Sequence, residues 1–192
     1  MKLILTTILS LFLTISANAV EVTCDNPKQF ADDLTSEALV ILKNKSPQVR
    51  DELKKLFNQV VNAEWMAKFA AGRYWRKFSD IQKDKYKAAY KDYISNNYVN
   101  NLGEYKGQDS SVKQVKELKR GNYLVETTIS TPNEPEIAVK YRVKKVGDCF
   151  KINDIVVEGV SLITSHRSDF GSILKNKSID DLISMLESKN EQ

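Results

Sequence analysis

The sequence predicts an α+β fold in which helices pack on one face of a curved antiparallel sheet of about four strands. Up to Gly107, apolar residues recur at the 3.6-residue spacing of helices, and after it they alternate with polar residues as in strands. Helical spacing returns after Gly159. The 192 residues are 42% hydrophobic and 28% charged, which is typical of one water-soluble domain.

The first nineteen residues have the pattern of an export signal. Lys2 supplies a positive start, residues 3–15 form an apolar run, and residues 17–19 are the small Ala-Asn-Ala that a signal peptidase prefers. A helix over the apolar run would rise only about 20 Å, which is too short for a hydrocarbon core of roughly 30 Å. We therefore expect a signal peptide over residues 1–19 and a single domain over residues 20–192.

Four helices are expected before Gly107, each marked by a capping signal or by an apolar stripe. Their ranges are residues 27–42 after the cap Asn26-Pro27, residues 47–60 after Ser46-Pro47, residues 63–72, and a long helix towards Leu102 that begins with the capping box of Ser79 and Gln82.

Alternating patterns predict the strands, and helical spacing predicts two further helices after them. In residues 137–143, apolar positions alternate with Lys140 and Arg142, so this strand has one dry face and one basic, wet face. Residues 112–118 fit a strand or a helix equally well. The other predicted strands are residues 123–129 and 150–157, the latter with both faces buried, and the predicted helices are residues 162–174 and 178–187.

The expected export of the chain determines how its two cysteines and its charge distribution are interpreted. An even cysteine count in an oxidising compartment predicts a disulfide between Cys24 and Cys149, with two free thiols as the alternative. Residues 65–151 carry 18 basic and 10 acidic side chains. In an exported protein this excess favours anionic lipid head groups or an acidic partner protein over nucleic acid, and a solvated lysine-rich surface is the alternative.

Motifs for catalysis, metal binding and nucleotide binding are missing from the sequence. His166 is the single histidine, and no serine or cysteine lies in a nucleophile-elbow pattern. Clustered zinc ligands and glycine-rich phosphate loops are also absent. We therefore expect no enzyme, no metal site and no cofactor. The strongest acid–base candidates for an alternative enzymatic function are Asp154 and Glu158.

Residues 65–105 hold most of the aromatic side chains, including Tyr90 and Tyr98. Tyrosine suits a wall that is apolar inside and wet at its rim, but it also fills solid cores. Composition does not separate these two arrangements.

Several segments, taken in order, resemble the MlaC family, the periplasmic phospholipid-binding component of the Mla lipid-transport system, also called toluene-tolerance proteins. They are residues 72–77 (GRYWRK), 104–108 (EYKGQ), 141–143 (YRV), 155–162 (IVVEGVSL) and 167–170 (RSDF). The resemblance covers residues 27–187. It implies a cone-shaped, cystatin-like or nuclear-transport-factor-like fold around a deep apolar cavity.

The resemblance also implies a function and partners. Members of the family carry the acyl chains of a phospholipid in the cavity and leave the head group near its mouth. They pass lipid between an outer-membrane lipoprotein–porin complex and an inner-membrane ABC transporter with its substrate-binding subunit. For this chain we accordingly expect a monomeric periplasmic carrier whose only bound small molecule is its phospholipid cargo.

The candidate lipid-lining residues lie on the dry faces of the predicted strands and on the apolar faces of the predicted helices. They are Tyr90, Tyr98, Leu102, Val139, Tyr141, Val143, Ile155, Val157, Leu162, Phe170 and Leu174. The candidates for a basic rim or partner face are Arg73, Arg142, Lys144 and Arg167. Two alternatives remain open from sequence: an enzyme with an apolar pocket, and an adaptor with a solid interior whose basic strand face binds a partner.

Overall fold

The computed structural model describes residues 22–44, 46–102 and 106–190, with the side chains of residues 101 and 102 left out. The predicted signal peptide therefore lies outside the described residues. The helices are α1 (Pro27–Lys43), α2 (Val49–Val60), α3 (Ala63–Ala71), the 3₁₀ helix η1 (Gly72–Lys77), α4 (Asp80–Leu102), α5 (Leu162–Asn176) and α6 (Ile179–Asn190). The strands are β1 (Asp109–Glu117), β2 (Asn122–Ser130), β3 (Ile137–Val146), β4 (Cys149–Val157) and β5 (Val160–Ser161).

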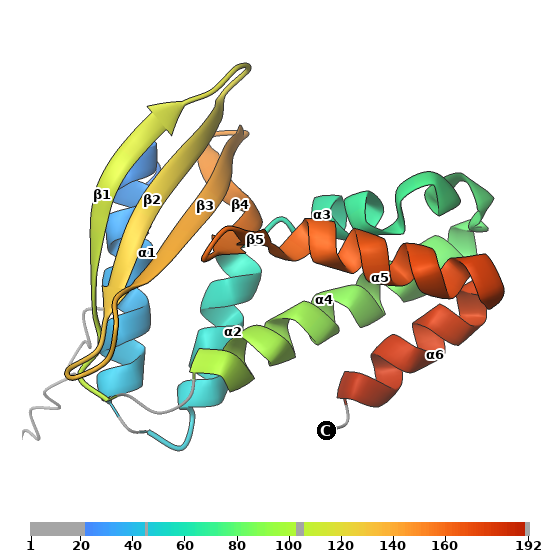
Figure 1. Cartoon of the computed structure of the whole chain (residues 1–192), viewed down its shortest axis with the longest axis horizontal. Helices are drawn as coiled ribbons and strands as arrows, with labels where there is room; N and C mark the ends of the chain where they lie inside the picture. The colour runs from blue at the N-terminus through green and yellow to red at the C-terminus, as the bar shows by residue number, and fades with distance from the viewer. Residues whose placement is uncertain (1–21, 45, 103–105, 191–192) are drawn as a thin grey trace, which may run out of the picture.

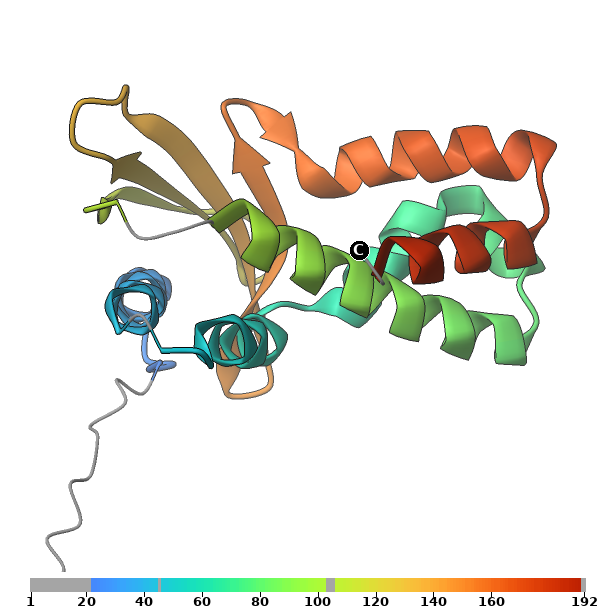
Figure 2. The same cartoon turned by 90° about the horizontal axis from the view of Figure 1, so that it is seen from below.

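The molecule has two halves that lie side by side along its long axis (Figure 1). The sheet half consists of β1–β5 with α1 and α2, and the helical half consists of α3, η1, α5, α6 and most of α4. Figure 2 shows α1 almost end-on beside one face of the sheet, while α4 runs from the helical half towards the sheet. Helix α1 packs on β1 and β2, and α2 packs on β4 and α4. Helix α4 thus connects the two halves.

The strands form an antiparallel sheet in the order β1-β2-β3-β4-β5, which confirms the α+β prediction. Residues 112–117 of the ambiguous segment belong to a strand, β1, which ends one residue before Leu118. The predicted sheet of about four strands gains the two-residue β5 as a fifth. Segment 46–48 departs from its prediction, because it forms a turn in which the Ser46 hydroxyl accepts from the Gln48 N–H, and α2 begins only at Val49.

A register shift in β4 explains the closely spaced apolar residues of that strand. Arg142 pairs with Asp154, whereas the next residue, Val143, pairs with Ile152, so Asn153 is an extra residue in β4. The shift brings both Ile152 and Ile155 to the face of the sheet that meets the helices. It also explains why residues 152–156 are all buried, as the sequence predicted.

The predicted N-terminal caps are present for α1 and α4. The Asn26 side chain accepts from the Gln29 N–H at 2.9 Å, and Pro27 is the first residue of α1. Ser79 and Gln82 bond reciprocally at 3.1 and 3.2 Å, which is a capping box. Local sequence signals therefore determine where both helices start.

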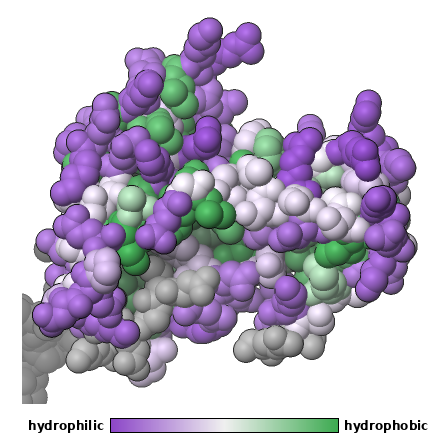
Figure 3. Space-filling model, viewed as in Figure 1, coloured by the Kyte–Doolittle hydropathy of each residue, from purple (hydrophilic) through white to green (hydrophobic). Residues whose placement is uncertain are grey.

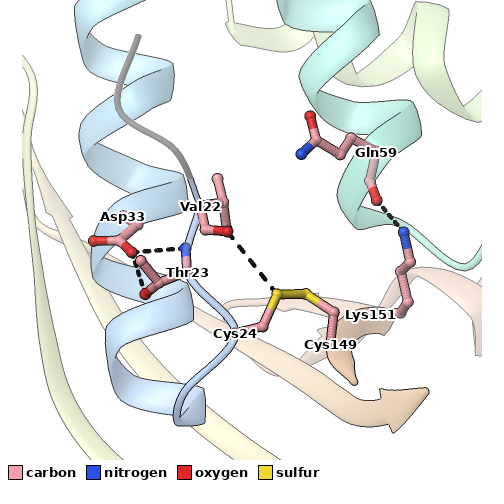
Figure 4. Close-up of a disulfide and its surroundings, with 7 residues drawn as sticks. All are labelled: Val22, Thr23, Cys24, Asp33, Gln59, Cys149 and Lys151. Atoms are coloured by element: carbon pink, nitrogen blue, oxygen red, sulfur yellow. Dashed lines mark hydrogen bonds between the residues drawn. A yellow bond between two sulfur atoms is a disulfide. The ribbon is translucent and has the colours of Figure 1, made fainter. Parts of the chain in front are cut away.

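The segment before α1 is fastened to the sheet and to α1 itself (Figure 4). Cys24 and Cys149 form a disulfide across 125 residues, with a Cα–Cα distance of 4.7 Å. The N–H and hydroxyl of Thr23 donate to the Asp33 carboxylate at 2.9 and 2.6 Å. Burial raises the pKa of Asp33, but these bonds and one from Gln29 outweigh it, so the net shift is downward.

Aromatic side chains fill the core of the helical half. Tyr86 and Tyr90 are fully buried, and their ring centroids lie 6.3 and 6.0 Å from that of Phe170. The Tyr86 hydroxyl donates to the Ala67 carbonyl at 3.2 Å, and the Tyr90 hydroxyl lies 3.1 Å from Nδ1 of His166. Phe78, Tyr86 and Tyr90, three aromatic residues of the stretch 65–105, are thus buried ring against ring in this core.

Candidate functional site

A cavity of about 330 Å³ lies between α1, the C-terminal part of α4 and the strands β1–β3. Its interior is apolar, and α1 contributes most of it through Leu34, Ala38 and Leu42, which are all buried. These residues recur at intervals of four along the helix, so they form one stripe that faces the sheet. The stripe faces an open cavity along part of its length.

Two tyrosines form the inner wall of this cavity. Tyr98 of α4 and Tyr141 of β3 also border a second void of about 10 Å³, lined further by Phe57 and Ile155. The rings of Phe57 and Tyr98 lie 4.8 Å apart. Burial raises the pKa of Tyr98, and the nearby Tyr141 raises it further. Burial also raises the pKa of Tyr141, with a smaller opposing effect from a hydrogen bond with Thr127. Both hydroxyls therefore remain neutral.

Polar and charged residues surround the opening of the cavity. Lys106, Asp109 and Glu134 line it and are exposed, in contrast to the buried residues of α1. The hydroxyl-bearing residues Thr35 and Thr131 line it as well. An apolar interior with a polar rim fits a ligand that has a hydrocarbon part and a polar end.

Three of the predicted lining residues contact one or both of these spaces: Tyr98, Tyr141 and Ile155. Val139 and Val143 face the same side of the sheet, as predicted, but they are buried in the core and border neither space. The side chain of Leu102 lies outside the described residues. Alternation identifies the face of a strand, and neighbouring side chains decide whether that face is filled.

The remaining predicted lining residues lie elsewhere. Tyr90, Phe170 and Leu174 are buried in the helical half, where helices and not the sheet cover them. Leu162 begins α5 and is half-buried. The predicted burial of Val157 is wrong: this residue is 44% exposed, because β4 ends there in the turn at Glu158 and Gly159.

The sequence reasoning missed the contribution of α1 and α2 to the lining. Helical spacing places Leu34 and Ala38 on an apolar stripe of α1, and Leu56 and Phe57 on one of α2, but none of them was among the predicted lining residues. The detectable signal was that the predicted sheet has a dry face that some of the helices must cover, although α4 and α5 are nearer to the strands in sequence than α1 and α2 are. Figure 3 shows a largely hydrophilic surface with separate hydrophobic patches over the sheet half, near the junction of the two halves and over the helical half.

The predicted basic residues lie away from the cavity rim, in two separate places. Arg73 and Arg167 line a surface pocket of about 490 Å³ in the helical half, together with Lys68 and Arg76. The Arg167 guanidinium lies 4.8 Å from the centre of the Phe69 ring. Arg142 and Lys144 lie on the outer face of β3, so the structure does not bring the four predicted residues together.

The outer face of β3 is partly neutralised by ion pairs. Arg142 contacts the Asp154 carboxylate at 3.3 Å, and Lys140 contacts Glu126 at 2.9 Å. Asp154 is buried under the start of α5, where it also accepts from the Ser161 hydroxyl at 2.7 Å and the Ile163 N–H at 3.2 Å. The carboxylate of Asp154 therefore holds β4, β5 and α5 together.

His166 and Glu158, the other residues considered for catalysis, lie in surroundings that indicate structural roles. His166 is buried between aromatic rings, and burial lowers its pKa to about 4; nearby Asp169 raises the pKa and Lys189 lowers it, each by less than burial does. Glu158 is exposed in the turn after β4. Over the described ranges, no three histidine, cysteine or acidic side chains are placed to hold a metal ion. In the same ranges, no helix combines the length and the apolarity needed to cross a bilayer.

Comparisons with known proteins identify similar chains. A relative from Haemophilus influenzae, the "intermembrane phospholipid transport system binding protein MlaC", is 25% identical over 136 residues, which cover 69% of this chain and 64% of that protein. The chain thus spans just under two thirds of that relative. The toluene tolerance protein ttg2D of Pseudomonas putida is 23% identical over 167 residues, covering 83% and 78%.

A solved structure and a family model complete the comparison. The phospholipid-binding protein of Ralstonia solanacearum, determined in complex with a phospholipid, has a TM-score of 0.75 at 20% identity, covering 86% of this chain and 97% of that one. This likeness shows that the two proteins share a fold. The family model described as MlaC protein matches residues 31–188. Because this match spans most of the chain, the protein belongs to the MlaC family.

Proposed function

We propose that this protein is a non-enzymatic phospholipid carrier that holds acyl chain in the cavity between α1 and the sheet. The observation that carries the proposal is the composition of that cavity, whose apolar stripe from Leu34 to Leu42 ends at a polar opening. Membership of the MlaC family and the relatives named for phospholipid transport support it.

The free energy of hydrocarbon exposure explains why a carrier is needed. Each methylene group exposed to water costs about 0.8 kcal/mol, so two chains of roughly thirty carbons in total would cost about 25 kcal/mol to cross water unprotected. If the cavity is as apolar as the bilayer interior, the free energy of moving the acyl chains from the bilayer into the protein is close to zero. The direction of transfer then depends on the partners at each end.

The size of the cavity indicates that loading requires some opening. A volume of about 330 Å³ lies at the lower end of ligand-binding cavities, which hold roughly 300–1,000 Å³. Tyr98 and Tyr141 separate it from the small second void. We expect these two rings to move apart when an acyl chain enters, because they are the side chains common to both spaces together with Leu34.

The cellular setting is part of the proposal. The export signal expected over residues 1–19 directs the chain to the periplasm, where the Cys24–Cys149 disulfide is stable. There it acts as a monomer that shuttles lipid between an outer-membrane lipoprotein–porin complex and an inner-membrane ABC transporter with its substrate-binding subunit. Family membership supports these partners.

The test is organic extraction of the purified mature protein, followed by mass spectrometry. We expect phospholipid close to one molecule per chain. Replacing Ala38, which lines the cavity, by Phe should remove most of the bound lipid, because the ring occupies the space of the acyl chain. Val40→Phe is the matched control, since Val40 is on the same helix but 43% exposed.

Two results would contradict the carrier. An extract without phospholipid would leave an adaptor as the better description. Chemical modification of an added lipid by the wild-type protein, lost on removal of the Asp154 or Glu158 carboxylate, would point to an enzyme. Equal lipid content in Ala38→Phe and Val40→Phe would place the lipid outside this cavity.

A further inference from the structure

We propose that the cavity prefers phospholipids whose head group carries an amine beside the phosphate, such as phosphatidylethanolamine, over anionic ones such as phosphatidylglycerol. This inference rests on the proposed carrier function and names its preferred substrate class. The charges at the rim of the cavity, and the way the fold brings them together, support this preference.

The rim carries charges of both signs, with carboxylates in excess. Among the described residues that line the cavity, Lys106 is the single cation, and Asp109 and Glu134 are the two anions. The ion pairs of the described residues include none of these three side chains, so their charges are available to a ligand. The arginines that the sequence suggested for a basic rim lie in the helical half or on the outer face of β3.

The fold places these three residues around one opening although they come from three segments. Asp109 begins β1 and pairs in register with Ser130, the last residue of β2, so it lies beside the turn that contains Glu134. The segment that holds Lys106 touches the same turn, because a Cβ on Gly107 would lie 3.2 Å from Cγ of Pro132. The Glu134 N–H closes that turn by donating to the Thr131 carbonyl at 3.1 Å.

The arrangement matches a zwitterionic head group in charge. With the acyl chain against α1, the phosphate and the ammonium of phosphatidylethanolamine both lie at the opening, where one ammonium and two carboxylates are available to them. An ethanolamine ammonium gains attraction from Asp109 and Glu134 that the neutral glycerol of phosphatidylglycerol does not. An anionic head group has a net negative charge, and it enters a rim whose described side chains also have a net negative charge. This repulsion disfavours the anionic lipid.

The expected preference is modest, because the rim is exposed to water. Exposed ion pairs are weak, so two carboxylates should favour the amine-bearing lipid by roughly two- to thirtyfold. Salt screens such interactions, so the preference should shrink at high ionic strength.

The experiment is lipid exchange with vesicles of defined composition. Purified mature protein is incubated with vesicles of equimolar phosphatidylethanolamine and phosphatidylglycerol, separated from them and extracted, and the ratio of the two bound lipids is measured. We expect a ratio of at least two for the wild type, and a fall to one or below for Asp109→Asn/Glu134→Gln. The matched control Glu117→Gln/Asp148→Asn removes two exposed carboxylates at the opposite ends of the strands and should keep the wild-type ratio.

The outcomes separate this inference from the proposed function. Lipid bound at a ratio of one, or a ratio unchanged in Asp109→Asn/Glu134→Gln, would overturn the preference and leave the carrier intact. No bound lipid of either kind would overturn both. The wild-type ratio at low and at high salt provides a second measurement that needs no variant, and a preference that does not weaken with salt would contradict an electrostatic origin.

Discussion

The two halves of the molecule use their apolar residues differently. In the helical half, Tyr86, Tyr90 and Phe170 contact one another and leave their rings almost without exposure. In the sheet half, Leu34 and Ala38 are also buried, yet they face a cavity of about 330 Å³. Burial alone therefore does not distinguish a packed side chain from one that lines a space.

The contrast assigns separate tasks to the two halves. The helical half provides rigid packing, because its rings interlock and its hydroxyls are bonded. The sheet half leaves part of the buried apolar stripe of α1 unfilled, which forgoes packing contacts and provides space for the hydrocarbon part of a ligand. Substitutions in the two halves should accordingly differ in their effects on stability and on lipid content.

The largest expected effect is the loss of a packed ring. Phe170→Ala should lower the free energy of unfolding by about 3–5 kcal/mol, because it leaves a void among rings that cannot collapse into it. Denaturant unfolding of the two proteins would measure this. The fraction that remains folded should still bind lipid, and loss of lipid from well-folded Phe170→Ala would show that the helical half also contacts the cargo.

Removal of the Cys24–Cys149 disulfide should have the next largest effect, and it acts on the sheet half. Replacing both cysteines by serine should lower the free energy of unfolding by about 2–4 kcal/mol, since the bridge closes a long loop in the unfolded chain. The measurement is denaturant unfolding beside the wild type with and without reductant. Two reactive thiols in the native wild type before reduction would show that the bridge does not form in solution.

The buried histidine of the helical half should make stability depend on pH. The pKa of His166 falls from the ordinary 6.5 to about 4 on folding, so between these values the unfolded chain binds the extra proton. The free energy of unfolding should therefore fall as pH drops from about 6.5 to about 4, by at most roughly 3 kcal/mol from this residue. Unfolding of His166→Phe should show a flatter profile in that window, and an equally steep profile would assign the dependence to other groups.

The smallest effect is expected for truncation of a side chain that already borders the cavity. Leu39→Ala should lower the free energy of unfolding by only about 1 kcal/mol, because Leu39 is half-buried and makes fewer contacts than Phe170. Its bound lipid should be retained. A loss as large as that of Phe170→Ala would mean that the sheet half is as tightly packed as the helical half.

Local signals predicted the elements well. Asn26 and the Ser79–Gln82 pair mark helix starts that the structure reproduces, and alternation from Ile137 to Val143 identified β3 and its inner face. These features depend on neighbours in sequence. The bulge at Asn153 could not be foreseen, because it arises from the pairing of two strands.

The lining of the cavity was harder to predict because it depends on how elements pack. Tyr90 and Tyr98 lie about 12 Å apart on the same helix, and the sequence alone gives no reason to assign them different roles. One meets His166 in the helical half, while the other meets Tyr141 beneath the sheet. The α1 stripe was visible in the sequence, but only its position opposite the sheet shows that part of it faces open space.

The attachment of the N-terminal segment has a consequence for how the cavity opens. The disulfide joins Cys24 to β4, and Thr23 is bonded to Asp33, so the first turns of α1 are tied down. If an acyl chain forces α1 away from the sheet, we expect the Leu42 end of the helix to move farther than the Cys24 end, because only the Cys24 end is held to β4 by a covalent bond. Reduction of the bridge should remove that restraint and weaken the retention of bound lipid.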